Sequence, residues 1–199
     1  MAAYLTLASR MPTSAEDPDG AAWRDVVSYL CSVWLDDYAV AGREVVEVRT
    51  DGFSYLFDIE AERLIAAWGV SRGRHDGERD KARMAGHPLS AGRLYHRGHA
   101  IPHTLGGPTD INLVPQLGRV NIGAFRRLEK EAVATPGSLY FTYWRYPRSF
   151  ASQLPIGVDQ GLLIAGEAPR IVQHLNLRAR DAGVPPAGSP PGEAAGDSR

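Results

Sequence analysis

A two-residue turn signal, Asp51-Gly52, governs the expected fold of the first third of the chain. It separates two runs of residues rich in β-branched and aromatic side chains, 44–50 and 53–59, and Asp-Gly between such runs is typical of a tight β-hairpin. A third run of this kind, 63–70, follows a short connection. These runs predict three consecutive strands of one antiparallel sheet.

Two segments instead show the three- and four-residue spacing of amphipathic helices. In residues 21–40 the apolar residues at this spacing are Val27, Leu30, Cys31, Trp34 and Tyr38. In residues 120–134 they are Phe125, Leu128 and Ala132, and Pro136-Gly137 follows. Shorter extended runs predict strands at 94–102, 111–116, 138–146 and 162–165. A last short helix is expected over 170–180.

These elements predict an α+β fold, in which a central antiparallel sheet carries a strand–loop–strand–helix unit on one face. The 199 residues suit one domain. We place this domain at 21–180, after an N-terminal segment at 1–20, with the strand–loop–strand–helix core at about 93–135. Residues 71–92 are polar and predict a long surface loop. The tail at 181–199 is rich in Pro, Gly, Ala and Ser and is expected to be disordered.

Charge is distributed unevenly, although the whole chain has a formal net charge of only −1. Residues 1–70 contain 5 Arg or Lys and 12 Asp or Glu, whereas residues 71–150 contain 13 Arg or Lys and 6 Asp or Glu. The excess positive charge therefore lies in the middle of the chain. Such asymmetry favours a face that binds a polyanion, although charge clusters are often only solvated surfaces.

Cys31 is the only cysteine, so the chain cannot form an internal disulfide. Its apolar neighbours predict a small buried hydrophobe rather than a reactive thiol. No stretch has the length of a membrane-spanning helix, and residues 1–14 lack the features of a secretory signal. We therefore expect a cytoplasmic protein without a membrane partner, with export by a signal-independent route as the alternative.

The residues that favour a chemical function lie between positions 95 and 131. Hydrolysis of a phosphodiester requires a base that takes a proton from water, and groups that neutralise the charge of the transition state. A histidine has an unperturbed pKa of about 6.5, which suits the first task near neutral pH. His99 is the candidate base. Arg97, two residues earlier, is expected on the same side of a strand, where it can bind the phosphate.

Asn121 and Glu129 are the candidate residues of a metal site. In an α-helix, eight residues span about 12 Å and rotate the side chain by about 80°, so the two are poorly placed to ligate one ion directly. If Asn121 contacts the metal, Glu129 is expected to hold a metal-bound water. A site with so few protein ligands suits Mg²⁺, with Mn²⁺ as the alternative ion, better than a closed zinc site.

The segment resembles the DNA/RNA non-specific endonucleases of the ββα-metal, or His-Me finger, superfamily. Their signature is Asp-Arg-Gly-His, an Asn…Pro-Gln element, and a helix that carries Asn and, eight residues later, Glu. The matching residues here are Arg97-Gly98-His99, Asn112 to Gln116, Asn121 and Glu129. The resemblance covers roughly residues 93–165. It is faint or absent upstream, where the family supplies more strands and often another phosphate-binding arginine.

The resemblance implies a Mg²⁺-dependent endonuclease that cuts DNA, RNA or both with little sequence preference. It implies that His99 is the general base and that Arg97 contacts the phosphate. Asn121 would be the direct metal ligand, and Glu129 would act through a bound water.

Four further residues have expected supporting roles. By resemblance, Asn112 and Gln116 support the site. His96 stands where the family has Asp, a position with a supporting role, and the change bears on the orientation of neighbouring groups. His103, four residues after the candidate base, is a candidate for binding substrate.

Two other functions stay open from the sequence alone. One is a catalytically impaired nuclease fold that binds nucleic acid or a protein partner, which His96 favours. The other is a sequence-specific endonuclease of the related His-Asn-His type, with His103 recruited. An active, unspecific nuclease endangers its own cell, so we also expect an inhibitor or immunity protein, or delivery as a toxin.

Overall fold

The computed structural model describes residues 4–14, 20–38, 44–78, 93–147 and 152–178. The helices are α1 (Arg24–Tyr38), the π-helical turn η6 (Val120–Ala124) and α3 (Phe125–Ala134), with short 3₁₀ turns η2 (Ala8–Arg10), η3 (Ala21–Trp23), η4 (His103–Leu105) and η5 (Asp110–Asn112). The strands are β1 (Val45–Thr50), β2 (Phe53–Asp58), β3 (Arg63–Val70), β4 (Tyr95–His99), β5 (Leu113–Leu117), β6 (Leu139–Arg145), β7 (Gly157–Leu163) and β8 (Arg170–Leu175).

Within the described residues, six strands form one antiparallel sheet in the order β1-β2-β3-β6-β7-β8. The turn between β1 and β2 lies at Asp51-Gly52, where φ is 54° and 84°. Glycine adopts a positive φ without steric cost and Asp tolerates it better than most residues, so this pair closes the hairpin. The strands predicted at 44–50, 53–59 and 63–70 are confirmed.

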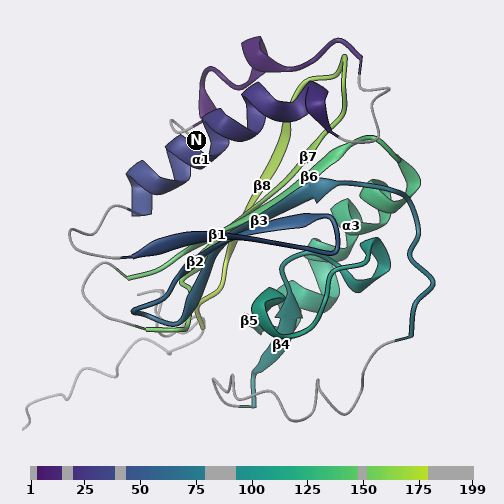
Figure 1. Ribbon diagram of the computed structural model, residues 1–199. Helices are drawn as coiled ribbons and strands as arrows, with labels where there is room; N and C mark the ends of the chain where they lie inside the picture. The colour runs from purple at the N-terminus through teal and green to yellow at the C-terminus, as the bar shows by residue number, and fades with distance from the viewer. Residues whose placement is uncertain (1–3, 15–19, 39–43, 79–92, 148–151, 179–199) are drawn as a thin grey trace, which may run out of the picture.

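Figure 1 shows that different parts of the chain cover the two faces of this sheet. Helix α1 lies over one face. Helix α3 lies over the other, next to β4 and β5, which pair as a separate two-stranded ribbon. The predicted α+β fold, with a strand–loop–strand–helix unit on one face of the sheet, is confirmed.

Aromatic side chains anchor both layers to the sheet. Trp34 of α1 is fully buried, and its ring centroid lies 5.7 Å from that of Trp68 and 5.2 Å from that of Phe141. Phe125, at the start of α3, is also fully buried and lies 6.1 Å from Trp144, centroid to centroid. Because side chains alternate along a strand, Phe141 and Trp144 of β6 reach different helices. Large buried rings of this kind dominate the energetics of a core.

The N-terminal segment packs against the same core. Leu7 is fully buried and belongs to the main hydrophobic cluster. The hydroxyl of Tyr4 donates a hydrogen bond to Oδ2 of Asp159 on β7, at 3.0 Å. These contacts hold residues 4–11 against the sheet.

The short helix predicted over 170–180 is wrong in its described part, because Arg170–Leu175 form the edge strand β8. Ile171 and Val172 are β-branched and pack against the hydrophobic core. Such side chains suit a pleated surface. Pairing with β7 provides hydrogen bonds for the backbone groups along one edge of β8, whereas an isolated helix of this length gains little stability. Tertiary pairing therefore overrides the weak helical spacing.

Two other expectations concern the C-terminal half and the long loop. The strand predicted at 162–165 is the end of β7, which begins earlier, at Gly157. The tail at 181–199, predicted to be disordered, and residues 79–92 of the predicted loop lie outside the described residues.

Cys31 is expected to react slowly with iodoacetamide while the protein is folded. Burial, and then the nearby Glu47 carboxylate, raises the pKa of its thiol to about 12. Only the thiolate is nucleophilic, and at about pH 8 a thiol with that pKa is roughly 10⁻⁴ ionised, against about a quarter for a free cysteine. Mass spectrometry of alkylation with and without urea measures this. Equal rates in the folded and unfolded protein would contradict it.

Candidate active site

Strand β4 carries two of the predicted functional residues on one side. Arg97 and His99 are two positions apart, and both line one cavity, whereas Gly98 between them is buried. A Cβ atom at Gly98 would lie 2.8 Å from the Cβ atom and 2.2 Å from Oε1 of Gln116, on the paired strand β5. Glycine is therefore required for the close packing of the ribbon that presents these two side chains.

The loop after His99 is held in place by Asn112, which is fully buried. Its Oδ1 accepts a hydrogen bond from the backbone N–H of Ile101 at 2.7 Å. Its Nδ2 donates to the carbonyl oxygens of Ile101 and Pro108, at 2.8 and 2.9 Å. Gly107 allows the loop to close, because a Cβ atom there would lie 1.9 Å from the carbonyl oxygen of Ile101. Asn112 thus clamps the backbone that follows the candidate base.

The helix predicted over 120–134 is not one continuous α-helix. Val120–Ala124 form a π-helical turn, and Gly123 has non-helical backbone angles, φ −104° and ψ −105°. The rise and rotation of an ideal α-helix therefore do not apply between Asn121 and Glu129. Both side chains line the same cavity.

This cavity has a volume of about 550 Å³, and we call it the His99 cavity. The sequence-predicted residues that line it are Arg97, His99, His103, Asn121 and Glu129. They come from β4, η4, η6 and α3, so the ribbon and the helix face each other across it. The ring centroids of the two histidines are 6.3 Å apart, and the rings are nearly perpendicular, at 84°.

The charged part of this lining is mostly cationic. Arg74, Arg97, Arg126 and Lys130 face the cavity, with Glu129 as the carboxylate. This excess of positive side chains favours the binding of an anion, and the guanidinium group of Arg in particular matches the geometry of a phosphate.

Three of these cations were not predicted as site residues. Arg74 follows β3, and a sequence pattern shows only that it belongs to a charged loop. Arg126 and Lys130 are four residues apart on α3, and this spacing places them on one helix face. That spacing, next to Glu129, is the signal in the sequence that could have identified them.

His96 contacts Asn121, which lines the His99 cavity. Nδ2 of Asn121 lies 3.4 Å from Nδ1 of His96, where the amide can donate a hydrogen bond to an unprotonated ring nitrogen. Gly118 leaves room for the imidazole, because a Cβ atom there would lie 2.8 Å from Nε2 of His96. The contact engages the amide nitrogen of Asn121, so the amide oxygen is the group available to a cation.

Asn112 and Gln116 are fully buried and do not line the His99 cavity. Gln116 lies behind Gly98, and within the described residues neither its Oε1 nor its Nε2 has a hydrogen-bond partner. The supporting role expected of Gln116 stays a prediction. The contacts of Asn112 are those of a structural clamp.

A family model described as DNA/RNA non-specific endonuclease matches residues 37–137, half of the chain. The chain belongs to this family. It is therefore an endonuclease that hydrolyses phosphodiester bonds, and β4, β5 and α3 are its ββα-metal motif. The match begins before β1, so the upstream strands also belong to the family, and it ends at residue 137, before β6. This corrects the expected span of 93–165 at both ends. No curated protein sequence is significantly similar to the chain.

The family implies a nucleic-acid substrate. No helix in the described part of the endonuclease has both the length and the apolar character needed to span a bilayer.

Members of this family typically depend on a metal ion, and the donors in the His99 cavity fit one. Asn121 supplies an amide oxygen and Glu129 a carboxylate. Hard oxygen donors suit Mg²⁺, which keeps several waters in its shell. Among the described side chains, no group of three or more His, Cys, Asp or Glu is arranged to hold a metal. Water and substrate would therefore complete the coordination.

Proposed function

We propose that this endonuclease is Mg²⁺-dependent, that it cuts DNA, RNA or both with little sequence preference, and that His99 is its general base. The observation that supports this is the meeting of His99, Asn121 and Glu129 in one cavity with a mostly cationic charged lining. Contacts to the phosphate backbone carry no sequence information, which accounts for the low specificity.

Two residues of β4 perform the central tasks in this proposal. The imidazole of His99 accepts a proton from the attacking water. The guanidinium of Arg97 binds the non-bridging oxygens of the same phosphate, where two parallel N–H groups fix its orientation.

Arg74 supplies the further phosphate-binding arginine that the family resemblance places upstream. Its Nε donates to Asp76 at 3.0 Å, which holds the side chain from outside the cavity. The two terminal nitrogens of the guanidinium then serve the phosphate.

Three residues prepare the metal site. The amide oxygen of Asn121 is the direct ligand, and His96 keeps the amide in that orientation through the contact with its nitrogen. Glu129 holds a water of the ion. When bound, Mg²⁺ would neutralise the charge that develops on the leaving oxygen.

We also propose that a protein inhibitor restrains the enzyme in the cell that makes it, whether it acts in the cytoplasm or is exported as a toxin. The cationic lining of the His99 cavity favours an acidic partner, because complementary charge speeds association and excludes other partners. A stable acidic protein that co-purifies and blocks cleavage supports this, and robust growth during overexpression of the active enzyme alone contradicts it.

Conversion of supercoiled plasmid to nicked and linear DNA tests the proposed function. We expect cleavage in Mg²⁺, none in excess EDTA, and a smear of products rather than discrete fragments. Asn121→Ala is expected to raise the Mg²⁺ concentration for half-maximal cleavage at least about tenfold. A folded RNA incubated in parallel gives the preference between DNA and RNA. If the folded wild-type protein binds both polymers but cuts neither in Mg²⁺ or Mn²⁺, it is a catalytically impaired binding protein.

A further inference from the structure

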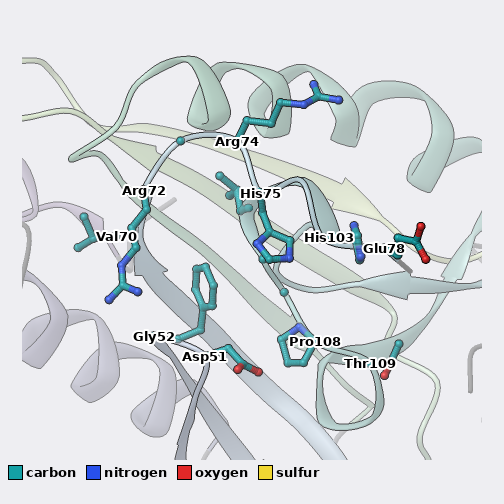
Figure 2. A pocket seen from close by; sticks show the side chains of 15 residues that line it. Asp51, Gly52, Val70, Arg72, Arg74, His75, Glu78, His103, Pro108 and Thr109 are labelled. Carbon is teal, nitrogen blue, oxygen red and sulfur yellow. The ribbon is translucent and has the colours of Figure 1, made fainter. Parts of the chain in front are cut away.

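A second cavity, of about 750 Å³, adjoins the His99 cavity, and we call it the His75 cavity. The two cavities share the side chains of Arg74 and His103 in their linings. Figure 2 shows the His75 cavity between the residues that follow β3, the Asp51-Gly52 turn and the loop around Pro108. Its volume lies within the range of about 300 to 1,000 Å³ that is usual for small-ligand sites.

The two cavities differ in charge. Arg72 and Arg74 line the His75 cavity together with Asp51 and Glu78, so its formal charges balance, whereas cations dominate in the His99 cavity. The His75 cavity therefore lacks the excess of cations that favours a phosphate in the His99 cavity. Phe53, a residue that is 5% exposed, also lines the His75 cavity. A mixed polar and apolar lining of this kind suits the base and sugar of a nucleoside better than its phosphate.

Three imidazole rings lead from one cavity to the other. The ring centroids of His99 and His103 are 6.3 Å apart, and those of His103 and His75 are 5.8 Å apart. The backbone N–H of His75 donates to the carbonyl oxygen of Thr104 at 2.8 Å, which fixes the backbone of His75 at the wall of the cavity, and the residue is exposed.

We propose that the His75 cavity binds the base and sugar of an unpaired nucleotide next to the bond that is cut, with the base stacked on the ring of His75. Imidazole is one of the rings on which unpaired bases stack. The inference rests on the proposed function, because it takes the scissile phosphate to lie in the His99 cavity.

Single-stranded nucleic acid is then the better substrate. A base in a duplex is stacked between its neighbours and enters such a cavity only if it is flipped out, at a cost of a few kcal/mol. The endonuclease is therefore expected to cut a single strand more readily than the duplex of the same sequence.

Steady-state cleavage of a labelled single strand and of its duplex, in Mg²⁺, tests this assignment. His75→Ala is expected to raise KM for the single strand about tenfold, the usual effect of one lost stacking platform, and to leave kcat within about twofold. His75→Phe keeps a flat ring and is expected to restore a KM close to that of the wild type. KM for the duplex is expected to be the same for all three proteins.

A second readout is the position of the cuts. A bond beside an abasic site offers no base to the His75 cavity, so the wild type is expected to cut it more slowly than the same bond beside an intact nucleotide. His75→Ala is expected to lose this discrimination. Arg49→Ala, an exposed residue that lines neither cavity, is the control for a general surface effect.

Two results would overturn the proposal. One leaves the proposed nuclease function intact, and the other overturns it as well. If the wild type cleaves but has the same KM and cut pattern as His75→Ala on the single strand, the His75 cavity does not bind a nucleotide and the nuclease function stands. If the folded wild type cleaves neither substrate in Mg²⁺ or Mn²⁺, the proposed function fails and this assignment fails with it.

Discussion

Replacing His99 with alanine is expected to lower the rate constant for cleavage by about 10²- to 10⁴-fold at neutral pH, the usual contribution of a positioned general base. The other groups that line the His99 cavity stay in place, so binding of the substrate is expected to change far less than kcat. Single-turnover cleavage of a labelled oligonucleotide measures the chemical step, and fluorescence anisotropy in EDTA measures binding.

Added imidazole provides a sharper version of this experiment. The His99 cavity has about 550 Å³ of space before any side chain is removed, so it admits a small free base. Imidazole is expected to restore part of the activity of His99→Ala in a concentration-dependent way. His103→Ala removes the same kind of side chain from the same cavity and is expected to show no such rescue. If imidazole rescues neither variant and both lose equal activity, the base is another group.

Replacing Asn112 with aspartate is expected to cause the largest loss of stability of any near-isosteric change in the site. The new carboxylate still accepts the hydrogen bond from the N–H of Ile101. Its second oxygen, however, faces the carbonyl oxygens of Ile101 and Pro108, and the residue is fully buried. An uncompensated buried charge costs about 3–5 kcal/mol. For a protein of this size, each kcal/mol lowers the melting temperature by roughly 2–4 °C, so a fall of about 10 °C is expected.

Asn121→Asp is the matched control for that measurement. It makes the same chemical change on a half-buried amide that borders a cavity and contacts His96 rather than buried carbonyl oxygens. Its melting temperature is expected to stay within about 3 °C of the wild type. Thermal unfolding followed by circular dichroism compares the two. Similar melting temperatures for Asn112→Asp and the wild type would show that Asn112 does not clamp the loop after His99.

Local sequence patterns predicted most of the helices and strands, because interactions between residues close in the chain produce them. The Asp51-Gly52 turn follows from backbone conformations that these two residues tolerate, and its position also defines the ends of β1 and β2. The alternation of side chains along a strand is equally local, and it correctly placed Arg97 and His99 on one side of β4.

One error arose where a long-range contact competes with a local preference, and another at a single glycine. Residues 170–175 have a weak helical spacing, but β7 offers a paired edge and a hydrophobic surface, so they form β8. Gly123 interrupts the helix expected over 120–134. Nothing in the apolar spacing around Gly123 signals this interruption, because Phe125, Leu128 and Ala132 keep their helical periodicity beyond it.

The amino-acid sequence by itself determined the type and order of the reactive groups: an arginine and a histidine on one strand, an amide after the next strand, and a carboxylate on the following helix. Only the tertiary structure decided that Arg74, Arg126 and Lys130 share a cavity with them and that His75 continues the row of rings beyond it. The physical reason is that spacing along the chain reports which side of one element a residue occupies. The distance between residues on different elements depends instead on how the ribbon, the helix and the loop after β3 pack on the sheet.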